Sequence, residues 1–478
     1  MNMGSLKNKT LLGVLWSGAE RFSVQGIQFI VMIFIARVLS PKEYGLVGLL
    51  TIFIAVSDSL INSGFSQALI RKQGRTDIDN CTVFYFNLVV SIVMYILLYS
   101  IAPWVADFYD EPQLCAIMRV MCLIVILYSL GVVQRAIYTA NIDFKTQAKA
   151  SAIAAIVSGG VGIYMAYSGY GAWTLVYQQL LNAGLNTMVL WLYSHWHPRL
   201  IYSWTSFRQL FAFGSKLMAS GLIDTIYKNL FPLIIGKIFS TNSLGYYSRS
   251  RHFAEFPSSN ITNILQRVTY PTLCEIQDDD ERLAVNYRKI LKLSAFIVFP
   301  MMVGLAAVAY PFIDVILGEK WHFAGTLLIP LCFSMMWYPI HAINLNLLQV
   351  KGRSDLFLKL EIIKKVMGVA VLLGSIPFGL IAMCYANIFS SLIALVINTY
   401  YTGKLINVGF FCQIRDLSPT FVVCILMFVL VWILVSLFNM PIIQLMIGSM
   451  VGMCFYLLVT YKFKFSELQE LFLLIRKK

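Results

Sequence analysis

Long apolar runs without charge alternate with short polar segments along the whole chain. The runs that contain no Asp, Glu, Lys or Arg are Cys81–Ala106, Ala150–Pro198, Leu293–Ile313, Phe323–Val350, Val366–Gly403 and Leu417–Tyr461. A helix that crosses a bilayer needs about 20 mainly apolar residues. Each run is long enough for at least one crossing, so the pattern predicts an all-α polytopic membrane protein.

Three of the runs are long enough for two crossings, and each has turn-forming residues near its middle. These residues are Gly169-Tyr170-Gly171, Pro377-Phe378-Gly379 and Asn439-Met440-Pro441. Counting apolar windows between such breaks, we expect about 14 transmembrane helices. Beyond Tyr461, apolar residues recur on one helical face before Arg476-Lys477-Lys478, which predicts an amphipathic helix on the inner membrane surface.

Composition and charge agree with a membrane protein and give its orientation. Hydrophobic residues make up 59% of the 478 residues, charged residues make up 13%, and the net charge is +14. By our helix count, roughly 26 of the Lys and Arg residues fall on the side of both termini and about four on the other side. Basic loops mark the cytoplasmic side, so we expect both termini in the cytoplasm and no nucleic-acid partner.

The sequence carries no signature of an enzyme. The nine cysteines stand singly without a CxxC pair, which indicates neither a disulfide framework nor a metal site. The chain also has no P-loop, HExxH or GxSxG motif. We therefore expect no catalytic activity, no metal and no cofactor.

One short pattern occurs twice, 200 positions apart. Residues Ala36–Gly45 align without a gap on Gly236–Gly245, and in both copies a cation closes an apolar segment before a polar loop and a glycine. In our count six helices separate the copies, so both halves enter the membrane in the same sense, as in parallel-repeat transporters. We predict two parallel six-helix lobes, 1–209 and 210–405, around a central hydrophilic cavity, with two appended helices and the tail in 406–478.

Charge inside the apolar spans is concentrated in four predicted helices, 11–36 and 44–63 in the first half and their counterparts 210–236 and 244–265 in the second. Charged side chains in a bilayer core cost a few kcal/mol each, so they face a partner or a wet cavity. The candidate substrate-binding residues of the lumen are Arg21, Gln25, Gln28, Lys216, Lys228, Arg249 and Arg251. The carboxylates that we consider for coupling transport to H⁺ or Na⁺ are Asp58, Asp224 and Glu255.

A purely structural role is the alternative for each of these charges. Asp224 and Lys228 are one helical turn apart, as are Arg251 and Glu255, so each pair can form an ion pair. Arginine and lysine suit a phosphate ligand. The carboxylates nearly balance the cations, so the charge of the substrate stays open.

Several motifs, taken in order, carry a resemblance to a known family. They are Trp16, Gln25, Phe29, Ala36-Arg37-x-Leu39-x-Pro41-x-x-Tyr44-Gly45, Gly64-Phe65-x-Gln67-Ala68-Leu69-Ile70, Asn141-x-Asp143-Phe144, Gly171-x-Trp173-x-Leu175-Val176 and Gly245-Tyr246-Tyr247-x-Arg249. The chain resembles the polysaccharide repeat-unit flippases of the multidrug/oligosaccharidyl-lipid/polysaccharide exporter superfamily. The likeness is closest to the lipopolysaccharide and colanic-acid branch.

The resemblance implies both a transport reaction and a location. It implies that an undecaprenyl-pyrophosphate-linked oligosaccharide moves from the cytoplasmic to the outer leaflet of a bacterial inner membrane by alternating access. The product would serve lipopolysaccharide, capsule or exopolysaccharide synthesis, with functional contact to a polysaccharide polymerase. Cationic lumen positions of the family correspond to Arg21, Lys228, Arg249 and Arg251.

Two other functions stay open at this point. A cation-coupled multidrug exporter of the same superfamily would favour an aromatic, acidic pocket over one with several Arg and Lys. A membrane polysaccharide polymerase or ligase would need large exterior loops, whereas the predicted exterior loops are short, as in Ala106–Glu111. The sugar unit, the energy source and the pathway stay open as well.

Overall fold

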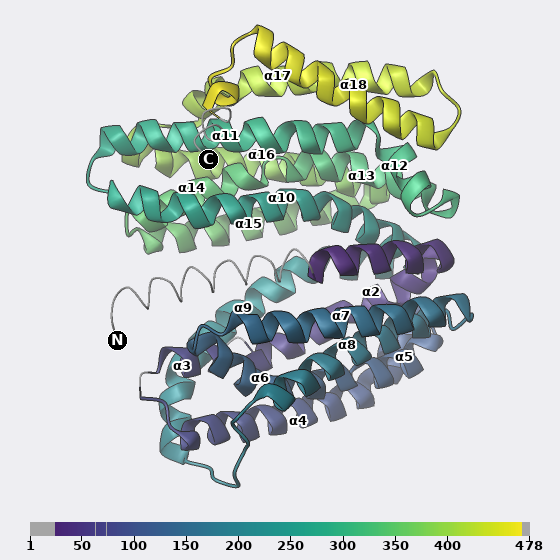
Figure 1. Ribbon diagram of the computed structural model, residues 1–478, viewed down its shortest axis with the longest axis vertical. Helices are drawn as coiled ribbons and strands as arrows, with labels where there is room; N and C mark the ends of the chain where they lie inside the picture. The colour runs from purple at the N-terminus through teal and green to yellow at the C-terminus, as the bar shows by residue number, and fades with distance from the viewer. Residues whose placement is uncertain (1–23, 63, 73, 471–478) are drawn as a thin grey trace. The chain divides into compact units, whose positions relative to one another are not determined.

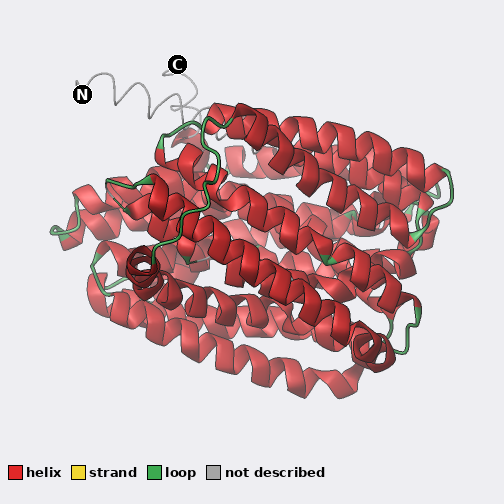
Figure 2. Ribbon diagram, turned by 90° about the horizontal axis from the view of Figure 1, so that it is seen from below, coloured by secondary structure: helices red, strands yellow, loops and turns green. Residues whose placement is uncertain are grey.

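The protein is built from membrane-length helices. The computed structural model describes residues 24–62, 64–72 and 74–470, with the backbone alone at 213, 216, 267 and 268. Within these residues the regular secondary structure is helical, as Figure 2 shows. Nine helical segments in this part of the chain are long and apolar enough to cross a membrane. The prediction of an all-α polytopic membrane protein is confirmed, and the total of about 14 helices stays a prediction.

The chain divides into two compact units, Met1–Gly245 (unit 1) and Tyr246–Lys478 (unit 2). Unit 1 contains the helix Val24–Val38, α2 (Pro41–Asn62), α3 (Phe65–Arg71), α4 (Asp77–Tyr109), α5 (Gln113–Met121), α6 (Leu123–Ala140), α7 (Phe144–Tyr167), α8 (Ala172–Tyr193) and α9 (Trp204–Ile238) (Figure 1). Helix α10 (Thr241–Glu275) begins in unit 1 and continues into unit 2. The predicted division at 209 and 405, with its two-lobe layout, remains a prediction.

Unit 2 continues with a second set of helices. They are α11 (Asp280–Ala307), α12 (Ala309–Ile316), η1 (Glu319–Trp321), α13 (His322–Met335), α14 (Tyr338–Val350), α15 (Ser354–Ser375), η2 (Ile376–Phe378), α16 (Gly379–Ile406), α17 (Phe410–Ser436) and α18 (Pro441–Lys462). Figure 1 shows α17 and α18 as a neighbouring pair in yellow-green to yellow, and α17 also packs against α11.

The three breaks predicted inside long apolar runs are confirmed. The helical stretch Ser354–Ile406 is 53 residues long, about 80 Å at 1.5 Å per residue, and a bilayer core is about 30 Å thick. The 3₁₀ turn Ile376–Phe378 divides it, followed by Gly379 at φ 93°. The other two breaks separate α7 from α8 and α17 from α18.

Polar caps fix where several helices begin. Thr76 accepts a hydrogen bond from the Asp79 backbone N–H, and the Asp79 carboxylate accepts one from the Thr76 N–H, which is a capping box at the start of α4. Asp143 caps α7 in a related way through the Thr146 N–H at 3.1 Å. These caps satisfy N–H groups that have no partner inside the helix.

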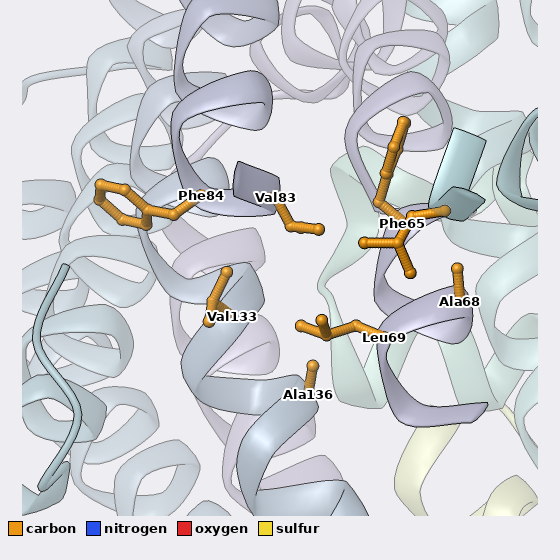
Figure 3. Packing of buried hydrophobic residues seen from close by; sticks show 8 residues of the cluster. Phe65, Ala68, Leu69, Val83, Phe84, Val133 and Ala136 are labelled. Atoms are coloured by element: carbon orange, nitrogen blue, oxygen red, sulfur yellow. The ribbon is translucent and has the colours of Figure 1, made fainter. Parts of the chain in front are cut away.

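A packed apolar cluster joins α3, α4, α6 and α9 within unit 1. Figure 3 shows Phe65 and Leu69 of α3 facing Val83 of α4 and Val133 and Ala136 of α6. Leu69 and Val133 are completely buried. Burying a side chain of this size contributes about 1.5–3 kcal/mol, so the short helix α3 is held mainly by its packing.

Large apolar side chains also lie on the surface of the protein. Trp104 is 71% exposed, Leu192 is 72% exposed and Phe378 is 77% exposed. Apolar surface of this extent is unusual on a soluble monomer and is expected where lipid tails surround the protein. The surface therefore agrees with the membrane-spanning lengths of the helices.

The two copies of the sequence repeat touch each other within unit 1. A Cβ placed on Gly45 would lie 1.8 Å from the Thr241 carbonyl oxygen, and one placed on Gly245 would lie 1.9 Å from the Pro41 carbonyl oxygen. The Glu111 carboxylate holds both copies, at 3.1 Å from Lys42 Nζ and 2.8 Å from Thr241 Oγ1. The glycines shared by the repeat thus allow two helix starts to meet closely.

Candidate functional site

The structure distributes the described lumen residues over three helices. Gln25 and Gln28 lie on the helix Val24–Val38, Lys228 on α9, and Arg249 and Arg251 on α10. Arg21 lies outside the described residues, and Lys216 belongs to α9 without a described side chain. Gln25 is half-buried, and its Oε1 atom has no hydrogen-bond partner among the described residues.

Helix α10 packs against α13 through two serines, and its charged residues Arg251 and Glu255 lie close to these serines in the sequence. Ser250 and Ser258 donate hydrogen bonds of 2.7 Å to the carbonyl oxygens of Ala324 and Met335, which fixes α10 against α13. Arg251 Nε lies 2.6 Å from a Glu255 carboxylate oxygen, and both side chains remain partly exposed. The predicted Arg251–Glu255 ion pair is thereby confirmed.

Helix α9 carries the second predicted ion pair. Lys228 Nζ lies 2.6 Å from an Asp224 carboxylate oxygen, and these side chains are 64% and 39% exposed. Ion pairs with this exposure contribute about 0.3–0.5 kcal/mol at i,i+4 spacing. Both predicted ion pairs exist, and neither is buried. Their small contribution to the stability of the protein therefore does not by itself explain why these charged residues are present.

Asp58 lies in a polar cluster of unit 1 that the sequence reasoning missed. Asn62 donates a hydrogen bond to the Asp58 carboxylate one turn along α2. Arg135 of α6 is near enough to interact electrostatically with Asp58, and its guanidinium donates a 3.0 Å hydrogen bond to Asn186 Oδ1 of α8. The cluster therefore joins α2, α6 and α8 around one half-buried cation and one half-buried anion.

A polar pattern on α8 could have revealed the cluster around Arg135. Gln178, Asn182 and Asn186 recur every four residues and so share one helical face. Asn182 donates to Ser158 at 3.0 Å and Asn186 donates to Ser151 at 3.2 Å, both on α7. The prediction from sequence weighed charged residues only, whereas this uncharged stripe indicates the interior-facing side of α8.

Unit 2 contains a different polar cluster, which is fully buried. Asn344 of α14 and Gln413 of α17 exchange two hydrogen bonds of 3.0 Å through their amide groups. Thr402 of α16 donates to Asn344 Oδ1 at 2.8 Å. These three side chains are 0–1% exposed, so they join helices rather than line a surface.

Ion pairs lie beside this cluster, near the start of α11. Arg288 donates two hydrogen bonds of 2.6 Å to the Asp416 carboxylate, a bidentate arrangement. Lys289 Nζ lies 2.8 Å from Glu470, which ties the described part of the tail to α11. In the described part of the chain no three His, Cys, Asp or Glu side chains gather as a metal ion would require.

Comparison with known proteins places the chain in a family. Residues 34–326, more than half of the 478 residues, match the profile of the polysaccharide biosynthesis protein family. The chain belongs to this family. The match confirms the resemblance to polysaccharide exporters that the opening motifs carry.

Named relatives also align over much of the chain. The lipopolysaccharide biosynthesis protein WzxC of Escherichia coli (strain K12) is 24% identical over 84% of this chain and 82% of its own length. The succinoglycan biosynthesis transport protein ExoT of Rhizobium meliloti (strain 1021) is 25% identical over 66% of this chain and 63% of its own length.

A solved structure shares the fold of this family member. The lipid II flippase MurJ, in an inward closed conformation, superimposes with a TM-score of 0.76 and covers 94% of this chain and 99% of its own. Its sequence identity is 14%, so the likeness concerns the fold.

Proposed function

We propose that this protein moves an undecaprenyl-pyrophosphate-linked oligosaccharide from the cytoplasmic to the outer leaflet of a bacterial inner membrane by alternating access. The observation that carries the proposal is the pair of half-buried arginines on α10 in a membrane protein of the polysaccharide biosynthesis family. Transport rather than catalysis agrees with the relative ExoT, which is a succinoglycan biosynthesis transport protein, and with the fold shared with a lipid II flippase. The product serves lipopolysaccharide, capsule or exopolysaccharide synthesis, next to a polymerase.

The pyrophosphate site in this proposal is formed by cations of the lumen. A guanidinium presents two parallel N–H donors that match phosphate oxygens. Arg251 Nε lies 2.6 Å from a Glu255 carboxylate oxygen, and part of the Arg251 side chain remains exposed. The proposed site consists of Arg21, Gln25, Gln28, Lys216, Lys228, Arg249 and Arg251.

The saccharide has different requirements, which the unit 1 cluster meets. Sugar hydroxyls need donors and acceptors in equal measure rather than net positive charge. Asp58, Arg135, Asn182 and Asn186 supply both, and all four are half-buried. We assign to this cluster the contact with the sugar unit, in addition to the residues predicted from sequence.

Ion coupling is a separate part of the proposal. Asp224 and Glu255 each hold a cation within 2.6 Å, so protonation of either one breaks an ion pair on a helix of the site. Asp58 interacts with an amide and a more distant guanidinium. Exchange of H⁺ or Na⁺ at these carboxylates, with both termini in the cytoplasm, is the mechanism that we propose for driving the cycle.

The test compares a lumen arginine with a matched arginine elsewhere. Arg249→Ala should abolish surface glycan while the amount of protein in the membrane stays normal, because one phosphate-binding fork is lost. Arg249→Lys should restore part of the export, and Arg199→Ala, which alters an exposed loop residue, should have no effect. Surface glycan and membrane-extracted protein are measured in the same cells.

The same variants separate flipping from other functions. Purified protein in vesicles should transfer a fluorescent lipid-linked oligosaccharide between leaflets, and Arg249→Ala should not. Normal export by Arg249→Ala would contradict the pyrophosphate site. Export of cationic drugs without flipping would contradict the substrate class.

A further inference from the structure

An apolar groove lies on unit 2, where α15 begins and α16 ends. Its volume is about 670 Å³, and its lining is mostly apolar. Ile363 of α15, Val396 and Tyr400 of α16 and Phe410 of α17 form much of the wall. Val396 is 48% exposed and Tyr400 is 56% exposed, so the groove opens on the apolar surface of the protein.

A tight turn between α16 and α17 shapes one end of the groove. Asn407 ends α16 with φ 56°, in the left-handed region that asparagine tolerates. A Cβ on Gly403 would lie 2.9 Å from Gly409 Cα, so the two helices approach closely at this turn. This approach places Phe410 at the edge of the groove.

Two lysines supply positive charge at the groove. Lys359 is exposed and belongs to the lining. Lys404 Nζ lies 4.6 Å from the centroid of the Tyr400 ring, so a cation–π contact keeps its ammonium group beside the wall. Among the described residues neither lysine forms an ion pair, and no residue of the lining is acidic.

The acidic residues that neighbour Lys359 along α15 are paired with other cations. Glu361 lies 2.5 Å from Lys364 Nζ, and Asp355 lies 2.8 Å from an Arg353 nitrogen. These pairs leave the charge of the groove positive. An apolar groove that carries two ammonium groups matches a molecule with a long apolar chain and an anionic head.

We propose that this groove binds an anionic phospholipid of the membrane. One acyl chain lies against Ile363, Val396 and Phe410, and the phosphate contacts Lys359 and Lys404. Basic pockets between transmembrane helices on the cytoplasmic side bind anionic lipid headgroups in other membrane proteins. Lysine stems also extend along apolar surface while the ammonium group reaches the headgroup layer.

The occupant differs from the proposed transport substrate. None of the residues assigned to the pyrophosphate or the saccharide lines the groove. The groove is formed by α15, α16 and the start of α17, and the assigned residues that the structure describes lie on other helices. The lipid site therefore goes beyond the proposed transport and does not depend on it.

The test measures lipid retention by the full-length protein. The protein is reconstituted with equal amounts of phosphatidylglycerol and phosphatidylcholine of the same acyl composition, purified in detergent, and analysed by native mass spectrometry. Each lysine near the headgroup layer should contribute about fivefold to the preference for the anionic lipid, and the two together about 25-fold. Lys359→Gln/Lys404→Gln should therefore retain little phosphatidylglycerol and unchanged phosphatidylcholine.

A charge-matched variant gives the control. Lys462→Gln/Lys464→Gln removes two exposed cations at the end of α18, outside the groove, and should keep the wild-type lipid ratio. An equal loss of phosphatidylglycerol in this variant, or no loss in the groove variant, would overturn the proposal.

A second pair of variants tests the apolar part of the groove. Ile363→Trp fills the groove and should lower retention of both lipids, whereas Leu358→Trp, at a 61% exposed position of the same helix, should lower neither. Undecaprenyl phosphate is added as a competitor in a further measurement. If it displaces phosphatidylglycerol at equimolar concentration, the groove belongs to a polyprenyl chain and the phospholipid assignment is wrong.

Discussion

The polar clusters of the two units use similar side chains in opposite environments. In unit 2, Asn344, Thr402 and Gln413 are 0–1% exposed and bond to one another at 2.8–3.0 Å. In unit 1, Arg135 and Asn186 are also bonded, at 3.0 Å, but both remain half-buried. The first cluster is closed to any further partner, whereas the side chains of the second stay partly exposed.

This difference separates packing from binding. A buried amide without a hydrogen-bond partner destabilises the fold by its full desolvation free energy. The unit 2 cluster therefore favours the one arrangement of α14, α16 and α17 in which its amides are paired. Groups that keep contact with solvent cost little to maintain and can exchange water for substrate. Polarity within a membrane protein therefore indicates function only when burial and hydrogen bonding are considered together.

The largest effect that tests this contrast is expected at Arg135. Arg135→Ala should lower flipping about 10- to 100-fold, because hydrogen bonds to a charged group contribute about 1.5–3 kcal/mol. The rate is measured with a fluorescent lipid-linked oligosaccharide in vesicles, together with the thermal unfolding temperature. Flipping at the wild-type rate, or a loss fully explained by unfolding, would remove Arg135 from the site.

The next effect concerns the buried amide pair. Gln413→Leu should lower the free energy of unfolding by about 1–3 kcal/mol, because the Asn344 amide loses two hydrogen bonds in a closed environment. Asn286→Leu alters a half-buried residue of α11 that donates a solvent-exposed hydrogen bond to the Arg282 carbonyl oxygen, and should change stability much less. Thermal unfolding in detergent measures both. Equal stability of the two variants would mean that the unit 2 cluster is not structural.

The smallest effect is expected at the exposed ion pair of α9. Lys228→Gln should change the free energy of unfolding by only about 0.5 kcal/mol, because an exposed i,i+4 pair contributes little. Its flipping rate should nevertheless fall if Lys228 contacts the pyrophosphate. A large loss of stability with normal flipping would assign the pair to packing instead.

Periodicity along single helices made much of this organisation predictable. The spacing of Asp224 with Lys228 and of Arg251 with Glu255 predicts two ion pairs, and both exist. The Gly-rich and Pro-rich breaks predict turns such as Ile376–Phe378, which is present. These features depend on contacts within one helix or one turn, which sequence spacing specifies directly.

Contacts between helices could not be predicted in the same way. Arg135 lies inside α6, which continues to Ala140. Its partner Asn186 is 51 positions away, and Asn344 and Gln413 are 69 positions apart. Such pairs depend on how two helices align in register, which one sequence without its folded structure does not reveal.

The close contacts of Gly45 with Thr241 and of Gly245 with Pro41 are reciprocal, as the contacts of an isologous interface are. In a two-fold symmetric dimer, residue i of one subunit meets j of the other while j meets i. Here one covalent chain supplies both sides, so a side chain at either glycine meets a carbonyl of the opposite copy. The two copies are free to diverge in charge elsewhere, yet at this point a change in one is constrained by the other.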